Sequence, residues 1–138
     1  MAARSTIVVV GAGAWGTAIA CHLAARAAAQ PRVRLIARSA ERADAMTRER
    51  RNERYLPGIV LPDGLEIGSD LGPAASADLV VVATPVAALD EVRAALAGAG
   101  ARSPLVWLSK GFVADGDRPG GGRGDAQQDQ SGQPDRDR

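Results

Sequence analysis

A glycine-rich segment that follows a short apolar run near the amino terminus constrains this chain more than any other feature. Residues 5–10 are short, β-branched and nearly continuous in apolar character, which is typical of a parallel strand buried on both faces. Gly11, Gly13 and Gly16 follow with the spacing G-x-G-x-x-G, and residues 14–28 contain strong helix formers throughout. A strand, a glycine turn and a helix in this order predict the first unit of a doubly wound α/β fold.

Each glycine of this turn has its own physical reason for lacking a side chain. Gly11 permits the tight turn off the strand, Gly13 lets a ligand approach the backbone, and Gly16 lets the helix pack closely against the strand. The N–H groups and the positive dipole end of the helix then favour an anion. The segment therefore predicts a site for the linked phosphates of a dinucleotide, and a plain tight turn is the alternative.

Strands and helices alternate through the rest of the first part of the chain. We expect strands at residues 33–37, 65–67, 79–83 and 105–108, and helices at residues 40–51 and 86–97. Residues 52–64 contain two prolines and two glycines and are expected to form a loop, and Ser69 or Asp70 is expected to cap a brief helical turn. This alternation predicts a Rossmann-like, doubly wound parallel sheet, in part of its full size.

Composition changes sharply near Val113. The 138 residues suit one domain, and 46% hydrophobic against 24% charged residues is an ordinary globular balance. Residues 114–138 hold no large apolar side chain, so they cannot bury enough surface to offset the entropy of ordering. We therefore expect residues 1–113 to form a dinucleotide-binding domain and residues 114–138 to form a disordered, low-complexity tail.

Charge, cysteine content and hydropathy argue against several classes of function. A net charge of +1 gives no field that would attract nucleic acid or an anionic membrane. The single cysteine, Cys21, cannot build a disulfide framework, and its neighbour His22 lacks further ligands at metal-binding spacing, so we predict no metal site. Because no apolar run is long enough for a membrane span or a secretory signal, we expect a cytoplasmic protein.

The end of the second strand predicts the type of cofactor. NAD-binding domains usually place Asp or Glu there, to accept hydrogen bonds from the ribose hydroxyls. This chain has Arg38 and Ser39 instead, and its first carboxylate, Glu41, already lies inside the next helix. A guanidinium can hold a 2′-phosphate with two hydrogen bonds. Arg38 therefore favours NADP(H), with NAD(H) as the second choice, and an ordinary surface arginine is the alternative.

Four blocks of sequence occur together in an order that points to one enzyme family. They are Gly-Ala-Gly-Ala-Trp-Gly-Thr-Ala from Gly11, Asn-Glu-Arg-Tyr-Leu-Pro-Gly from Asn52, Ala-Thr-Pro from Ala83 and Leu-Val-Trp-Leu-Ser-Lys-Gly from Leu105. In these blocks the chain resembles the N-terminal domain of the bacterial NAD(P)-dependent glycerol-3-phosphate dehydrogenases. The resemblance implies a cytoplasmic enzyme that interconverts sn-glycerol 3-phosphate and dihydroxyacetone phosphate for phospholipid synthesis.

The same resemblance implies roles for individual residues. Ala14 and Trp15 would contact the dinucleotide, and Arg38 and Ser39 would lie at its adenosine ribose. Lys110, in Ser-Lys-Gly after the last strand, would contact both the cofactor and the phosphate of the substrate. The position of Lys110 after a strand agrees with the rule that ligands of open α/β sheets bind outside the carboxyl ends of the strands. An exposed loop lysine is the alternative for Lys110.

The chain departs from the family's pattern after its last strand. Family members continue into a helical domain that supplies a lysine as general base, whereas Lys110 is the only lysine here and arginine stays protonated. The tail after Val113 resembles nothing in the family and reads like a shifted reading frame. We therefore expect a truncated half without a catalytic residue, inactive alone. A non-catalytic NADP(H)-binding module and a fragment that pairs with another subunit are the alternatives, and homo-oligomerisation is left open.

Overall fold

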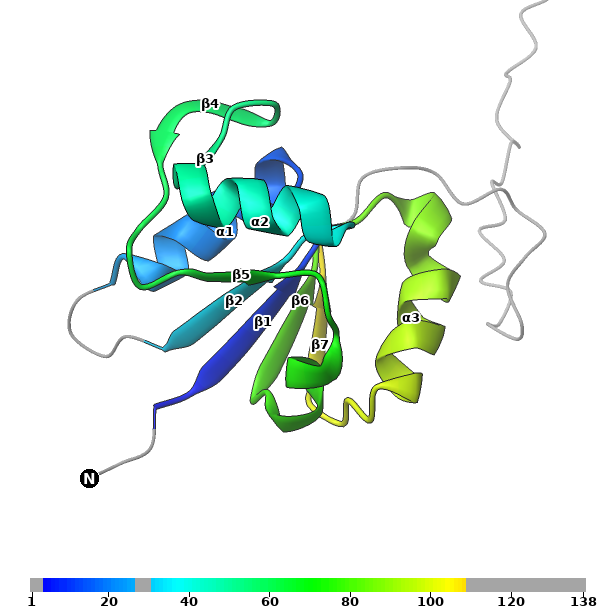
Figure 1. Ribbon diagram of the computed structural model, residues 1–138. Coiled ribbons are helices and arrows are strands. Elements are labelled where there is room, and N and C mark those ends of the chain that lie inside the picture. The colour runs from blue at the N-terminus through cyan, green and yellow to red at the C-terminus, as the bar shows by residue number, and fades with distance from the viewer. Residues whose placement is uncertain (1–3, 27–30, 109–138) are drawn as a thin grey trace, which may run out of the picture.

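Five parallel strands form one sheet in the part of the chain that the computed structural model describes, residues 4–26 and 31–108 (Figure 1). The strands of this sheet are β1 (Thr6–Val10), β2 (Arg32–Ile36), β5 (Glu66–Gly68), β6 (Leu79–Val82) and β7 (Leu105–Trp107). The helices are α1 (Ala14–Ala24), α2 (Ala40–Glu49) and α3 (Leu89–Gly98), with short 3-10 helices η1 (Gly72–Ser76) and η2 (Val86–Ala88). A separate antiparallel pair consists of β3 (Arg51–Asn52) and β4 (Leu56–Val60).

The strand order is β5-β2-β1-β6-β7, with β1 in the centre. Val10, the last residue of β1, lies opposite Ile36 of β2 on one side and Val82 of β6 on the other. The chain leaves β1 through α1 and builds the sheet outward to β5, and then returns to the other side of β1 to add β6 and β7. The direction of winding therefore reverses between β1 and β6, as in the predicted doubly wound fold.

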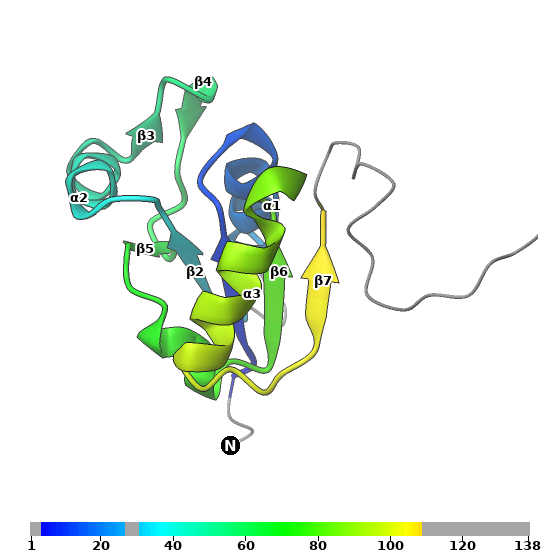
Figure 2. The same cartoon turned by 90° about the vertical axis from the view of Figure 1, so that its right-hand side faces the viewer.

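Two hydrophobic clusters cover the two faces of the sheet. α1 and α2 lie on one face and α3 on the other, as Figures 1 and 2 show. The first cluster joins strand residues to α1 and α2: Val9, Val33, Leu35, Val81, Ala20, Ala24, Ala43 and Met46. The second joins the alternate strand residues to η1 and α3: Val8, Val10, Ile36, Val80, Val82, Ala74 and Leu96. Burial on both faces explains why these strands are continuous apolar runs.

The helices are shorter than the sequence predicts. α1 ends at Ala24 and not at residue 28, and residues 27–30 lie outside the described part of the chain. α2 ends at Glu49 because Arg50 adopts the left-handed conformation, with φ 52°, and its N–H donates to the carbonyl of Met46 at 2.9 Å. The predicted helix at 86–97 begins as η2 and becomes α-helical only at Leu89.

The predicted loop at 52–64 was wrong, because most of this segment belongs to the β3–β4 hairpin. Asn52 pairs with Leu56, and Gly58, with φ 77°, permits a bend that a larger residue would resist. Buried Leu61 then anchors the return of the chain, and its N–H donates to the carbonyl of Arg50 at 2.8 Å. Proline is tolerated in an edge strand such as β4, so here it did not indicate a loop.

Further predictions concern the cap of a short helix, the chain after its last strand, and a membrane span. The brief helical turn after Asp70 is η1, but the prediction that Ser69 or Asp70 caps it was wrong, because its N-cap is Leu71 and makes no side-chain cap. Oδ1 of Asp70 accepts from the N–H of Gly72 at 3.0 Å, beside the start of η1. Lys110 and the predicted tail at 114–138 lie outside the described residues. Among the described helices, none is long and apolar enough to cross a membrane. The cytoplasmic location stays a prediction.

Candidate functional site

The glycine turn lies at the carboxyl ends of β1 and β6, where the winding of the sheet reverses. Gly11 has φ 109°, and its N–H donates to the carbonyl of Ile36 at 3.0 Å, which ties the turn to β2. A Cβ at Gly11 would lie 2.9 Å from the carbonyl oxygen of Ala83, which follows β6. The turn is therefore clamped between two neighbouring strands, and any side chain at its first glycine would break that fit.

The other two glycines of the motif have opposite surroundings. A Cβ at Gly16 would lie 1.8 Å from the carbonyl oxygen of Gly11, so α1 sits directly on the turn. This is the close packing of helix against strand that the third glycine permits. At Gly13, by contrast, no heavy atom of the described residues comes within 4 Å of the position of a Cβ, apart from its own atoms and those of its two chain neighbours. The backbone at Gly13 therefore has open space beside it.

The start of α1 suits an anion. Gly13 is the N-cap residue and has no side chain with which to cap the helix, and the first turn of α1, all of it described, contains no acidic residue. Ala14 and Trp15 open the helix with their side chains exposed, and Trp15 is 57% exposed. Gly13 therefore gives the positive end of the helix dipole no side-chain cap, and the first turn of α1 gives it no carboxylate. A phosphate group would meet both favourable charge and N–H donors here.

Arg38 and Ser39 lie at the same edge of the sheet as the glycine turn, because β1 and β2 are neighbours and Val10 pairs with Ile36. The side chain of Arg38 is exposed after the buried Ala37. Ser39 is the N-cap of α2, and its Oγ accepts from the N–H of Arg42 at 3.3 Å. Ser39 therefore has a structural role that the sequence analysis did not assign to it.

Asn52 is a residue of this region for which the sequence analysis predicted no role. It is 3% exposed, and its Nδ2 donates both to the carbonyl oxygen of Ala12 in the turn and to Oγ1 of Thr17, each at 2.9 Å. Its Oδ1 accepts from Nη2 of Arg42 at 3.4 Å. The β3–β4 hairpin is therefore joined to the glycine turn through one buried amide. The only sequence signal was the presence of Asn52 at the start of a block typical of the family.

Tyr55 anchors the hairpin to α2 from the outside. The guanidinium of Arg42 lies 5.0 Å from the centre of the Tyr55 ring, and that of Arg54 lies 5.3 Å from it. Both distances are within the range of cation–π attraction. Arg42 therefore contacts the hairpin twice, at the Tyr55 ring and at Asn52, which makes it the link between α2 and the residues that hold the turn.

Cys21 and His22 give no sign of chemistry. Burial raises the pKa of the Cys21 thiol, and the positive charge of Arg50 opposes that shift only in part. A thiol of this kind is protonated at neutral pH and is a weak nucleophile. Within residues 4–26 and 31–108, no three His, Cys, Asp or Glu side chains come together in a way that could hold a metal ion.

Comparison with known proteins places this geometry in a family. The family model described as the N-terminus of NAD-dependent glycerol-3-phosphate dehydrogenase matches residues 6–119. The chain belongs to this family. The match includes the glycine turn, the hairpin that carries Asn52 and all five strands of the sheet.

Curated relatives of this family are similar over the same part of the chain. A glycerol-3-phosphate dehydrogenase (NAD(P)+) from an Acidovorax species is 55% identical over 111 residues, which make up 79% of this chain and 33% of the relative. The enzyme of the same name from Variovorax paradoxus is 51% identical over 107 residues, 76% of this chain and 30% of the relative. The chain therefore spans about a third of the length of the curated relatives that it matches.

Solved structures of the family have the same fold. A glycerol-3-phosphate dehydrogenase from Coxiella burnetii superposes with a TM-score of 0.71 at 31% identity, over 80% of this chain and 34% of that one. The enzyme from Plasmodium falciparum superposes with a TM-score of 0.72 at 26% identity, over 82% and 34% of the two chains. The predicted Rossmann-like α/β fold is therefore confirmed.

Proposed function

We propose that this chain binds a nicotinamide dinucleotide at the start of α1, as the cofactor-binding part of a glycerol-3-phosphate dehydrogenase. The observation that carries the proposal is the contrast between the three glycines. Gly11 and Gly16 are closed in by backbone, and the backbone at Gly13 is open. A turn shaped only by packing has no need of the open position, whereas a turn that receives a diphosphate requires it.

The residues of the site fit such a cofactor. The backbone from Gly13 to Trp15 would hold the diphosphate, because this end of α1 has neither a side-chain cap nor an acidic residue in its first turn. Arg38, exposed at the end of β2, would lie beside the adenosine ribose and favour NADP(H) over NAD(H). When bound, the dinucleotide supplies the group that accepts or donates a hydride, and the residues of this chain bind and orient it.

The substrate pair that we propose is sn-glycerol 3-phosphate and dihydroxyacetone phosphate, with Lys110 at the phosphate of the substrate. Oxidation of a hydroxyl also needs a base within hydrogen-bond reach of its proton. The family resemblance implies a lysine of a further domain as this base, and Lys110, the only lysine among the 138 residues, is already proposed to hold the phosphate of the substrate. We therefore expect these 138 residues by themselves to bind the cofactor without turning over the substrate.

Titration calorimetry of the 138-residue chain with NADP+ and with NAD+ tests the proposed cofactor. We expect NADP+ to bind more tightly, and Arg38→Gln to lower its affinity about tenfold, because a charge-assisted pair of hydrogen bonds is lost, while the affinity for NAD+ stays unchanged. Arg48→Gln is the matched control, because Arg48 is a well-exposed arginine in the last turn of α2. A folded chain that binds neither dinucleotide would contradict the proposal.

An assay of NADPH oxidation with dihydroxyacetone phosphate tests the expected lack of turnover. The 138-residue chain should show no rate above that of a blank without protein. A steady turnover that disappears when the chain is removed would contradict the proposal that a base from outside these residues is needed.

A further inference from the structure

The buried amide of Asn52 is the only side-chain amide whose hydrogen bonds, among those described, reach the glycine turn. We propose that Asn52 is a positioning residue, which fixes the peptide between Ala12 and Gly13 and so aims the N–H of Gly13 at the phosphates of a dinucleotide. This inference rests on the proposed function for its ligand, and on the contacts of Asn52 for its geometry.

The contacts of Asn52 determine which way its amide faces. The carbonyl oxygen of Ala12 can only accept, so the Nδ2 side of the amide must point to the turn, where the distance is 2.9 Å. Arg42 can only donate, so Oδ1 must point to Nη2 of Arg42, at 3.4 Å. Oγ1 of Thr17 receives the second Nδ2 hydrogen at 2.9 Å. Both hydrogens and the oxygen of the amide are used, and no other common side chain of this size offers that set.

The hydrogen bond from Asn52 to the carbonyl of Ala12 also sets the direction of the N–H of Gly13. A peptide bond is planar and trans, so its C=O and N–H point in opposite directions. When Asn52 holds the carbonyl of Ala12 toward the hairpin, the N–H of Gly13 in the same peptide must point away from it. At Gly13 the space at the position of a Cβ is open. Asn52 therefore sets the direction of a donor on the side of the turn where a phosphate would lie.

Burial makes this arrangement rigid. Asn52 is 3% exposed and Thr17 is fully buried, so water does not compete for their hydrogen bonds. Behind Asn52, Arg42 is itself held by the Tyr55 ring at 5.0 Å, and its N–H is bonded to Ser39, the N-cap of α2. The turn is thus connected to the start of α2, beside Arg38, through a chain of side-chain contacts. Because this donor is already fixed in the free protein, less conformational entropy is lost when a ligand binds.

The test compares Asn52→Asp and Asn52→Ala with the wild type in the full 138-residue chain. Aspartate keeps the size of the side chain and loses both donors, and alanine loses the donors without adding a charge. Ile59→Thr is the control on the same hairpin, because Ile59 is 45% exposed. We expect the dissociation constant for NADP+ to rise about tenfold or more in both Asn52 variants and to stay unchanged in the control.

The second readout needs no ligand. The amide resonance of Gly13 in the free chain reports the environment and orientation of its N–H, and we expect it to shift in both Asn52 variants and to keep its position in Ile59→Thr. A folded Asn52 variant with the wild-type Gly13 resonance, or with wild-type affinity, would overturn the proposal. Unfolding of both variants would also overturn it, because Asn52 would then serve the fold and not the turn. If the wild type binds no dinucleotide, the proposed function fails, and the Gly13 resonance still decides the role of Asn52 in shaping the turn.

Discussion

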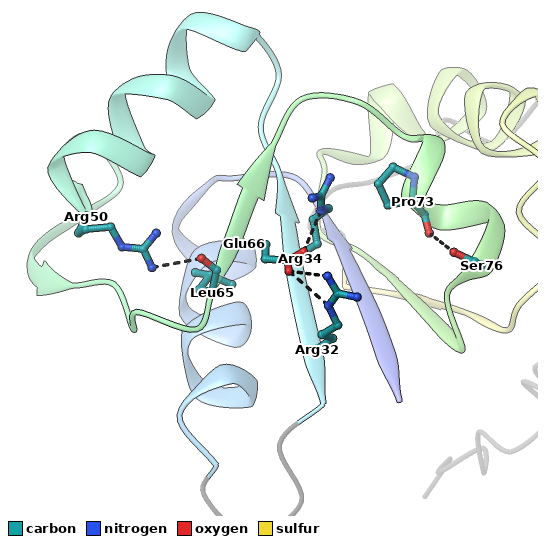
Figure 3. A network of polar contacts seen from close by, with 7 residues as sticks. All are labelled: Arg32, Arg34, Arg50, Leu65, Glu66, Pro73 and Ser76. Atoms are coloured by element: carbon teal, nitrogen blue, oxygen red, sulfur yellow. Dashed lines mark hydrogen bonds and ion pairs between the residues drawn. The ribbon is translucent and has the colours of Figure 1, made fainter. Parts of the chain in front are cut away.

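The glycine turn and the arginine–glutamate cluster of β2 and β5 both contain polar contacts, but they are built in opposite ways. The cluster consists of Arg32, Arg34 and Glu66, in which Nη2 of Arg32 lies 3.0 Å and Nε of Arg34 lies 3.3 Å from the carboxylate (Figure 3). The side chains are 65%, 33% and 37% exposed in that order. At the turn, by contrast, the polar groups of Asn52 and Thr17 are buried.

The difference shows that buried polar contacts determine the structure more strongly than exposed ones. Exposed ion pairs are screened by water and contribute little, even when their geometry is good. A buried donor that loses its partner costs the full desolvation of that group. Each contact at the turn is therefore difficult to replace, whereas the cluster tolerates substitution.

Gly16→Ala should destabilise the fold most. The added Cβ would lie 1.8 Å from the carbonyl oxygen of Gly11, which is backbone and cannot move aside without shifting α1 off the turn. We expect a loss in the free energy of unfolding of about 3 kcal/mol or more, measured by urea denaturation. Gly98→Ala is the control, because Gly98 ends α3 with nothing within 4 Å of its Cβ position, and it should change stability by less than about 1 kcal/mol.

Thr17→Val should have the next largest effect. The two side chains have the same shape, but valine leaves an Nδ2 hydrogen of buried Asn52 without its acceptor. We expect a loss of about 1–3 kcal/mol in the free energy of unfolding. Thr47→Val removes a hydroxyl that donates to Ala43 at 2.7 Å on an exposed part of α2, and it should cost less than about 1 kcal/mol. Equal losses in the two variants would contradict the importance of burial.

Gly13→Ala should weaken the binding of the dinucleotide and leave the stability of the fold nearly unchanged. Gly13 has φ −77° and open space, so alanine fits without strain, and the free energy of unfolding should change by less than about 1 kcal/mol. The methyl group would occupy the space that the diphosphate needs, so we expect the affinity for NADP+ to fall about tenfold. Calorimetry beside urea denaturation checks both values. Unchanged affinity in a folded variant would argue against a diphosphate at this position.

Glu66→Gln should have the smallest effect and should depend on pH. The hydrogen bond from Arg32 holds the pKa of Glu66 below its usual value, with Arg34 adding to the shift and desolvation opposing it. Because the pKa is lower in the folded state, the carboxylate stabilises the fold above its ordinary pKa, and this contribution is lost as the pH falls through the folded pKa.

Urea denaturation of Glu66→Gln and wild type at neutral and acidic pH measures this effect. We expect a difference below about 1 kcal/mol at neutral pH, which salt reduces and acid abolishes. A difference as large as that of Thr17→Val would contradict the view that exposure makes this cluster weak.

The fold was predictable from local sequence because burial on both faces leaves a local pattern. β1 and β6 consist of β-branched residues apart from Leu79, and the alternation of such runs with helices determines the order of elements along the chain. The start of α1 was equally clear, since the G-x-G-x-x-G spacing of Gly11, Gly13 and Gly16 directly after an apolar run is a local pattern. These features depend on neighbours in the sequence, so sequence reasoning reached them.

The role of Asn52 was not predictable in the same way. Its partners, Ala12 in the turn and Thr17 in α1, are 40 and 35 residues away along the chain. No local period indicates such a contact, and the Pro57–Gly58 pair in the hairpin pointed to a loop. The early end of α2 depends likewise on Arg50, a residue type that seldom adopts the left-handed conformation. What was missed depends on tertiary contacts and on individual backbone angles.

The exposed position of Trp15 has a practical consequence for experiments on the proposed site. Its indole lies in the first turn of α1, and the chain has only one other tryptophan, Trp107, which is partly buried on β7. Indole emission overlaps the absorption of a reduced nicotinamide, so a coenzyme seated at this turn would quench the fluorescence of Trp15. The unlabelled protein thus carries its own optical reporter, and Trp15→Phe would leave Trp107 alone as the reference signal.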